Sequence, residues 1–222
     1  MKIMRSKNAL LILGIVLTLF SLFPSFRVIS QTIDNSLSGW DKDALSQANT
    51  AANVSYLSDE EKKLIFYTNL CRLKPKLFCQ TVLGDYLKAH PNNTPQVASL
   101  KRELNTNKGC GALVPDEELY TIARDFATKM GIEGKEGHVD FQKRVKPLMS
   151  RYNRVGENCD YGDYLALDAF MDLLIDSDDP INLGHRKNIL DPKFTDIGVS
   201  GQTHKTFRWN YVMDFAGLYE GN

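Results

Sequence analysis

The spacing of apolar residues changes from a helical to a strand period along the chain, and this change restricts the folds available. Between Leu119 and Met130, apolar residues recur at i, i+3, i+4, i+7, i+8 and i+11, which predicts a helix with one buried stripe. Beyond Ile197, apolar residues alternate with small or polar ones up to Phe215, which is the period of strands. Helices first and an antiparallel hairpin last predict an α+β fold in which helices cover one sheet.

Local signals set the expected ends of the central helix. Pro115 fits its first helical position, because proline lacks the N–H group that would be unsatisfied there. Gly131 follows the last apolar residue of the stripe and is expected to end the helix.

Further elements flank this helix. Ser58 and Glu61 form a capping box ahead of apolar residues at helical spacing, so a first helix begins there. Pro75 is expected to end or kink that helix. Another helical pattern spans about residues 164–176, and residues 201–205 read as the connection between the two C-terminal strands.

The first thirty residues have the layout of a secretory signal. Basic residues precede the uninterrupted apolar run 9–20, which is shorter than the roughly 20 residues of a membrane-spanning helix. Ser30 offers a small residue before Gln31, so cleavage is expected near Ser30. The alternative is an uncleaved N-terminal anchor. A cleaved signal predicts a secreted protein, extracellular or periplasmic, with no membrane span once residues 1–30 are removed.

The remainder divides into three segments. Residues 31–54 are polar with little periodicity, which predicts a loose lead-in segment. Residues 55–217 hold the predicted elements and form the folded domain, and residues 218–222 form a C-terminal tail. Removing residues 1–30 removes four basic residues and no acidic one, which leaves 23 basic against 27 acidic residues. This balance provides no basic field for nucleic acid, so no nucleic-acid partner is expected.

Four cysteines lie in the part expected to be exported, and an even count in an oxidising compartment predicts two disulfides. Cys71 and Cys79 are eight residues apart on a predicted helix, where a rise of about 1.5 Å per residue separates them by about 12 Å. We therefore favour bridges from this pair across to Cys110 and Cys159, with both pairings open. The alternative is four buried thiols. No C-x-x-C spacing supports a redox or zinc-ribbon role.

Two histidines beside glycines are the main candidates for chemistry. His138, Glu157 and His185 each lie next to or one residue from a glycine, between a helix and a loop or strand, and could converge on one cleft. Neutral imidazoles with a carboxylate are a ligand set for zinc, and a position left to water would allow Lewis-acid chemistry. No H-E-x-x-H motif occurs, so structural histidines with satisfied hydrogen bonds are the competing interpretation.

Other nucleophiles and histidines are less favoured. His90 and His204 lie in predicted loops, where a solvated surface histidine is the natural interpretation. No G-x-S-x-G motif occurs, so no serine is indicated as a nucleophile. The predicted disulfides argue against a cysteine nucleophile.

Five motifs follow one another over about 160 residues. They are Asn69-Leu70-Cys71-Arg72, the helix 119–130, Gly137-His138, Gly156-Glu157-Asn158, and residues 184–190 (Gly-His-Arg-Lys-Asn-Ile-Leu) with Phe194 to Gly198. In this order they resemble the CAP superfamily, the cysteine-rich secretory proteins, antigen 5 and pathogenesis-related 1, in its bacterial form.

The resemblance implies a three-layer α-β-α sandwich with a central antiparallel sheet over residues 55–217. It also implies a central cleft lined by two histidines and acidic residues, which fall here on His138, Glu157 and His185. The family's second acidic residue follows a Trp-Tyr-like pair on a helix. Its expected position falls on Leu173, with Asp172 beside it, so Asp172 joins the candidate cleft residues.

Relatives are associated with metal binding at the histidines, with lipid or sterol binding in some branches and with interaction roles, but with no shared reaction. The favoured hypothesis is an extracellular binding or interaction module, because no catalytic constellation is complete. It requires no cofactor, although a divalent metal such as zinc is compatible with His138 and His185. We expect a monomer that binds an unidentified small ligand, lipid or peptide.

Two alternatives stay open. In a zinc-dependent hydrolase, His138 and His185 hold the metal and Glu157 acts as general base. That interpretation fails if Glu157 instead forms an ion pair with Arg186 or caps a helix. In a structural polar network, the same three residues pin loops across the sheet, since buried polar groups require partners.

Overall fold

The structure of this chain is a computed structural model that describes residues 36–218. The expected signal segment 1–30 and residues 219–222 of the expected tail lie outside this range. Residues Gly39–Asn222 form one unit, and the description below concerns that unit. Within the described range, no helix combines the length and the apolar character needed to cross a membrane.

A four-stranded sheet lies at the centre of the unit. Its strand order is β1-β3-β4-β2, so β2 is an edge strand. The β2–β4 and β3–β4 pairs are antiparallel, as predicted, and a short β1 adds a parallel partner to β3, which makes the sheet mixed. The strands are β1 (Val114–Pro115), β2 (Tyr152–Tyr161), β3 (Asp196–His204) and β4 (Arg208–Leu218). The hairpin turn therefore lies after His204, later than the predicted 201–205.

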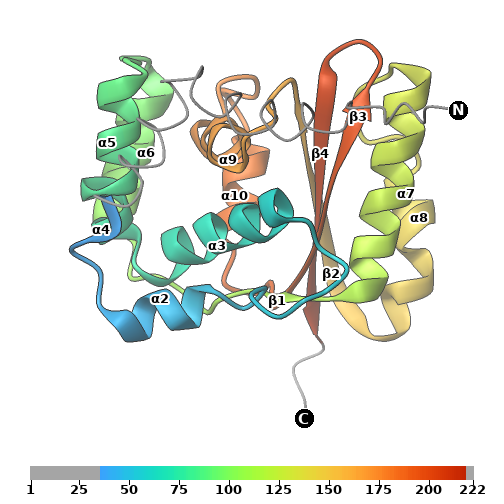
Figure 1. Cartoon of the computed structure of the whole chain (residues 1–222), viewed down its shortest axis with the longest axis horizontal. Coiled ribbons are helices and arrows are strands. Elements are labelled where there is room, and N and C mark those ends of the chain that lie inside the picture. Colours follow the sequence, from blue (N-terminus) through green and yellow to red (C-terminus); the bar gives the residue numbers. More distant parts are fainter. Residues whose placement is uncertain (1–35, 219–222) are drawn as a thin grey trace, which may run out of the picture. The chain divides into compact units, whose positions relative to one another are not determined.

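Helix α7 (Glu117–Glu133) covers one face of the sheet (Figure 1). Both of its predicted ends were wrong by a few residues. The Asp116 amide still donates to Ile197 O, 2.9 Å away, so the chain pairs with β3 through Pro115 and the helix begins only after Asp116 caps it. At the other end the helix continues past Gly131 to Gly134, whose φ of 69° supplies the left-handed cap.

Gly131 has a packing role instead. A Cβ atom on Gly131 would lie 2.1 Å from Thr203 O of β3. On the facing strand, a Cβ atom on Gly198 would lie 2.2 Å from both Leu119 C and Tyr120 N of α7. The two glycines therefore let the helix and strand backbones approach each other closely.

Helices also cover the opposite face, which completes the predicted three-layer α-β-α sandwich. Helix α3 contacts β3, and α9 and α10 contact β2. Figure 1 shows the sheet almost edge-on, with α9 and α10 on one side and α7 and α8 on the other. The remaining elements are α3 (Asp59–Leu73), α4 (Pro75–Gln80), α5 (Val82–Ala89), α6 (Pro95–Thr106), α8 (Phe141–Val145), the 3-10 helix η2 (Lys146–Ser150), α9 (Ala166–Ile175) and α10 (Gly184–Leu190).

Two of the predicted local signals act as expected. The Ser58 side chain accepts from the Glu61 amide and the Glu61 side chain accepts from the Ser58 amide, so the capping box starts α3. Pro75 separates α3 from α4 and occupies the first turn of α4. Phe78 of α4 packs edge-on against Phe170 of α9, with ring centroids 5.6 Å apart.

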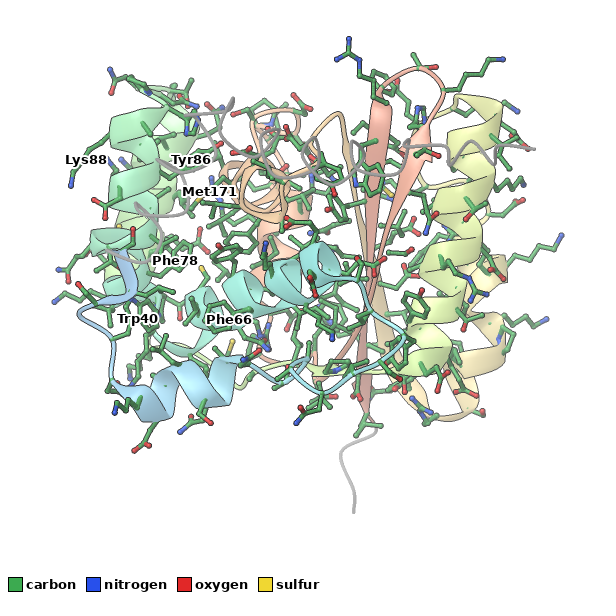
Figure 2. The ribbon with its side chains drawn as sticks, viewed as in Figure 1. Trp40, Phe66, Phe78, Tyr86, Lys88 and Met171 are labelled. Carbon is green, nitrogen blue, oxygen red and sulfur yellow. The ribbon has the colours of Figure 1, made fainter. Side chains whose placement is uncertain are left out.

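The described part of the segment 31–54 is not loose. It contains helix α2 (Lys42–Ala48), in which Ala44 and Ala48 are buried. Trp40 is also buried and its Nε1 donates to Thr81 Oγ1 over 3.1 Å (Figure 2). Because the buried residues of this helix are alanines, its sequence carries little apolar periodicity, and the helix was missed.

Side chains of the motif Asn69-Leu70-Cys71-Arg72 connect α3 by hydrogen bonds to loops that are distant in the sequence. Asn69 Oδ1 accepts from the Leu113 amide at 2.7 Å, and its Nδ2 donates to Ala48 O at 3.1 Å and Leu113 O at 3.0 Å. Arg72 is buried and donates to four backbone carbonyls, those of Gly111, Ile189, Asp191 and Phe194. This motif therefore holds the fold together rather than lining a cleft.

The predicted disulfides are wrong, because all four cysteines are free thiols. Cys159 lies on β2 and packs in a cluster with Ala123, Phe126 and Val212, on the α7 side of the sheet. Cys71 lies on α3, on the other side of the sheet. Two bridges from Cys71 and Cys79 would need one of them to reach Cys159 through the sheet, so the predicted pairing cannot form.

Candidate functional site

The edge strand β2 presents different side chains to its two faces. Successive side chains of a strand point to opposite sides. Cys159 packs against α7, so Glu157 shares the α7 face, whereas Asn158 and Asp160 share the opposite face. Because β2 is the last strand on this side of the sheet among residues 36–218, loops from both helical layers can meet at this edge.

His138 approaches from the α7 side. The amide of Gly137 donates to Tyr161 Oη at 2.9 Å, and Gly137 has a φ of 95°, which suits glycine. His138 Nδ1 lies 2.9 Å from Glu157 Oε1. The His138 side chain is 48% exposed, whereas that of Glu157 is 1% exposed. A buried carboxylate thus orients a solvent-accessible imidazole.

Glu157 is also paired with Arg144 of α8. Arg144 Nη2 lies 2.9 Å from Oε1 and 2.7 Å from Oε2 of Glu157. The guanidinium stacks over the Phe126 ring at 3.5 Å from its centroid. Arg186, the residue expected to compete for Glu157, instead donates to the carbonyls of Leu174, Ile175 and Gln96 and to Ser99 Oγ.

His185 approaches from the other side, at the start of α10. Its Nδ1 lies 3.1 Å from Asp176 Oδ1, and the Asp176 side chain is fully buried. Asn158 Nδ2 donates to His185 O at 3.0 Å, and Asn188 Nδ2 donates to Asn158 Oδ1 at 2.8 Å. A Cβ atom on Gly156 would lie 3.0 Å from Asn188 Oδ1, so glycine there permits the close approach of α10. Each residue of Gly156-Glu157-Asn158 therefore positions part of the site.

The structure brings His138, Glu157 and His185 together. The two imidazole centroids lie 6.3 Å apart with a 49° angle between the rings. Both Nδ1 atoms face buried carboxylates, so Nε2 is the nitrogen left on each ring. A histidine that binds a metal commonly has a carboxylate or a carbonyl beside its other ring nitrogen.

Asp172 lies near this site but does not hold a histidine. It lines a cavity of about 160 Å³ together with His185. Leu173 is buried, and the carboxylate that pairs with His185 belongs to Asp176, one helical turn after Asp172. The acidic residue beside His185 is therefore Asp176, and not Asp172 or the expected position Leu173.

Asp214 is a second buried carboxyl group beside Glu157. The β2–β4 register places Asp214 directly opposite Glu157, and Asp214 is fully buried. Burial raises the pKa of Asp214 well above its usual range, and the neighbouring Glu157 charge raises it further, against a smaller lowering by Arg144. A proton kept on Asp214 makes it a donor toward the Glu157 carboxylate.

The raised pKa of Asp214 predicts a pH dependence of stability. Above about pH 4, unfolded Asp214 loses its proton while folded Asp214 keeps it, so the folded state binds more protons and its stability falls as pH rises. The isosteric Asp214→Asn variant has no carboxyl group at this position and does not lose stability in this way as pH rises. Its free energy of unfolding should therefore rise relative to that of wild type as the pH increases above about 5, measured by urea unfolding. A stability difference that does not change with pH contradicts a neutral Asp214.

The remaining histidines have other roles. His204 is buried rather than solvated, because its Nε2 lies 2.8 Å from Lys135 O and its Nδ1 accepts from the Thr206 and Phe207 amides. His90 is exposed, as predicted, and packs near the Tyr86 ring.

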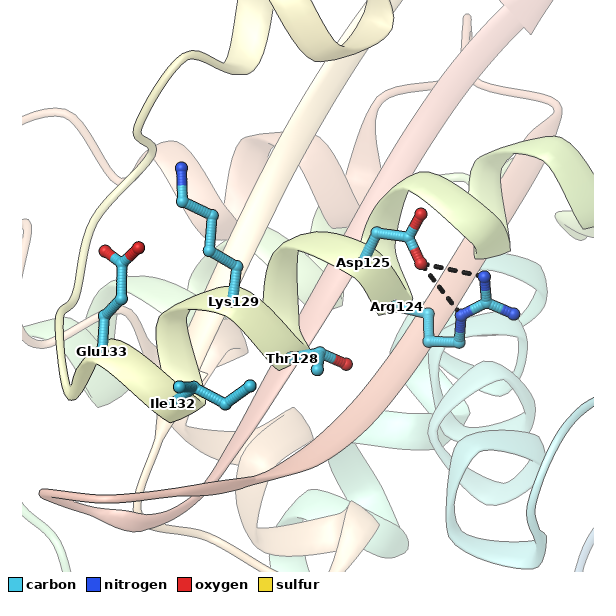
Figure 3. Close-up of a pocket in the computed structure, with 6 residues that line it drawn as sticks. All are labelled: Arg124, Asp125, Thr128, Lys129, Ile132 and Glu133. Atoms are coloured by element: carbon cyan, nitrogen blue, oxygen red, sulfur yellow. Dashed lines mark hydrogen bonds and ion pairs between the residues drawn. The ribbon is translucent and has the colours of Figure 1, made fainter.

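A shallow depression over the exposed face of α7 lacks the features of this site. Figure 3 shows its lining, in which Arg124 and Asp125 form an ion pair of 2.8 Å. It contains no histidine, and its charged side chains face solvent or one another. The edge of β2 is therefore the stronger candidate.

Comparison with known proteins gives a family match. The model of the cysteine-rich secretory protein family (CAP) matches residues 67–215, more than half of the chain. No curated protein is similar enough to count as a match.

Solved structures of three organisms are similar at low sequence identity. An extracellular SCP-domain protein from Bacillus anthracis is 16% identical, with 68% of this chain and 39% of that chain covered and a TM-score of 0.41. An outer surface protein from Borrelia burgdorferi is 21% identical, with 55% and 86% covered and a TM-score of 0.41. A venom allergen-like protein from Schistosoma mansoni is 12% identical, with 73% and 90% covered and a TM-score of 0.46.

Proposed function

This chain belongs to the cysteine-rich secretory protein (CAP) family, and from that premise we propose that it is an exported binding module whose cleft holds a divalent metal between His138 and His185. The observation that carries the proposal is the pair of accessible imidazoles, whose Nδ1 atoms lie 2.9 Å and 3.1 Å from buried carboxylate oxygens. The basic residues and apolar run at the N-terminus support export.

The two imidazoles suit zinc better than the neighbouring Glu157 and Cys159 do. A ring separation of 6.3 Å is only about 1 Å more than the roughly 5 Å expected for two imidazoles on one tetrahedral zinc ion. A small rotation of half-exposed His138 would close that difference. Burial raises the pKa of the Cys159 thiol well above its usual range, which disfavours a thiolate ligand. Two protein ligands leave positions open for water or for a donor atom of a small ligand or peptide.

The contacts of Glu157 argue against the zinc-dependent hydrolase. A general base must reach the water that it deprotonates. Glu157 is 1% exposed and both of its oxygens lie within 3 Å of Arg144. The ion pair that removes Glu157 as a general base is therefore formed with Arg144, and not with Arg186 as the sequence suggested. In this arrangement Glu157 positions His138, and the cleft binds without a complete catalytic set.

Zinc titration by calorimetry tests the proposal. We expect micromolar or tighter binding by wild type, and binding weakened by about 100-fold or more in His138→Ala and in His185→Ala. His90→Ala, which changes an exposed histidine outside the cleft, is the matched control and should bind as wild type does. Thermal melts without metal distinguish metal binding from the structural alternative. A purely structural network predicts a large loss of Tm in both His138→Ala and His185→Ala. No zinc binding by wild type would reject the metal cleft.

A further inference from the structure

A second group of carboxylates lies on the opposite face of β2 from Glu157. Asp160 belongs to β2, Asp163 follows it in the loop, and Asp172 lies on α9. One carboxylate oxygen from each of the three lies within 4.8 Å of the other two. Acidic side chains that face one another in this way repel unless a cation or protons intervene.

Asp160 is the residue that separates this cluster from an ordinary acidic surface. It is only 2% exposed, and within residues 36–218 neither of its oxygens accepts a hydrogen bond of normal geometry. A buried carboxylate without partners is costly, and most buried polar groups in proteins are paired. Asp160 is therefore a buried carboxylate whose desolvation no hydrogen bond of normal geometry within residues 36–218 offsets.

The surroundings of Asp160 supply negative charge and little positive charge. Burial, together with the charges of Asp163 and Asp172, raises the pKa of Asp160 to about 8, against a partial lowering by the Asp163 amide. Burial followed by Asp168 and Asp172 raises the pKa of Asp163 to about 6. No ion pair found in the described part of the chain involves any member of the cluster.

We propose that Asp160, Asp163 and Asp172 form a binding site for a hard divalent cation, with calcium as the best fit. All three donors are oxygens, which calcium prefers, whereas zinc prefers nitrogen and sulfur. The 4.8 Å limit on the oxygen separations is about twice a calcium–oxygen distance of roughly 2.4 Å. The cavity of about 160 Å³ that Asp160 and Asp172 line leaves room for the water ligands that complete a calcium shell.

This site is distinct from the histidine cleft, although the two are neighbours. His185 lines the same cavity as Asp172, but its Nδ1 pairs with Asp176. Glu157 points to the other face of β2, where it pairs with His138. The calcium proposal therefore stands whether or not zinc binds between the histidines.

Calcium titration by calorimetry on the purified, chelator-treated protein tests the proposal. Wild type should bind one calcium ion, and Asp160→Asn and Asp163→Asn should each weaken binding at least about tenfold. Asp163 is half-buried and outside the helices and strands, so its variant should fold even if Asp160→Asn does not. Asp125→Asn, which removes an exposed carboxylate paired with Arg124 (Figure 3), is the matched control and should bind normally.

His138→Ala separates the two neighbouring sites. If the proposal holds, this variant keeps wild-type calcium affinity, and calcium raises the Tm of wild type, His138→Ala and Asp125→Asn but not of Asp163→Asn. Three results would overturn the proposal. They are no calcium binding by wild type, unchanged binding by Asp163→Asn, and binding lost in His138→Ala but kept in Asp163→Asn.

Discussion

Replacement of Arg72 by methionine is expected to lower the free energy of unfolding by about 3–5 kcal/mol. Arg72 is 1% exposed and donates to the carbonyls of Gly111, Ile189, Asp191 and Phe194 over 2.8–2.9 Å. Methionine fills much of the same volume but donates nothing, so buried carbonyls lose their partner at a cost of about 1–3 kcal/mol each. In a domain of this size the Tm should fall by about 10 °C.

The comparison that isolates this effect is Arg124→Met. Arg124 lies on the exposed face of α7 and pairs with the adjacent Asp125 (Figure 3). Its replacement should change stability by less than about 0.5 kcal/mol. Urea unfolding followed by circular dichroism measures both variants. If Arg72→Met stays within about 1 kcal/mol of wild type, the guanidinium does not join α3 to these loops.

Replacement of Gly198 by alanine is expected to lower the free energy of unfolding by about 2–4 kcal/mol. The added Cβ atom would lie 2.2 Å from Leu119 C and Tyr120 N, which are backbone atoms and cannot rotate aside. Helix α7 must therefore shift away from β3, and the packing of its buried stripe is lost. In Gly131→Ala the added Cβ atom would lie 2.1 Å from Thr203 O, which also destabilises the fold. Part of this loss of stability is offset, because alanine is roughly 1 kcal/mol more favourable than glycine inside a helix.

Gly111→Ala controls for the general effect of removing a glycine. A Cβ atom on Gly111 has no neighbour within 4 Å, and its backbone needs no positive φ. Its replacement should be neutral or slightly stabilising, because alanine reduces the freedom of the unfolded chain. Equal stability of Gly198→Ala and Gly111→Ala in urea unfolding would show that α7 and β3 are not in close backbone contact.

Sequence periodicity predicted the elements that bury one continuous face. The stripe from Leu119 to Met130 forms most of α7, and the alternation beyond Ile197 forms β3 and β4. The ends of α7 could not be read correctly, because strand pairing before Asp116 and the close approach of Thr203 to Gly131 decide them. Both causes are contacts between segments far apart in the sequence.

Sequence motifs indicated three residues of the candidate site. The motif order identified His138, Glu157 and His185, and the structure brings them to one edge of the sheet. Arg144 and Asp176 were missed, since each completes a pair that forms only in the fold.

The positions of two buried carboxylates, Asp214 and Asp160, could have been noticed in the sequence as unusual. Asp214 lies between Met213 and Phe215 in the otherwise apolar run 211–216 of β4, and Asp160 follows Cys159 in β2. A charged residue at a core-facing strand position is rarely buried without a specific partner. For Asp214 that partner is Glu157, and for Asp160 we propose a cation.

A crystal structure of the protein grown with zinc tests the central claim most directly. The arrangement of the cleft predicts one ion bound by Nε2 of His138 and Nε2 of His185 at about 2.0–2.1 Å. Glu157 should remain paired with Arg144, and Asp176 with His185. An ion bound instead by Glu157 or Cys159 with Arg144 displaced, or two histidines without an ion at saturating zinc, would contradict the claim that this cleft is a histidine-based metal-binding site.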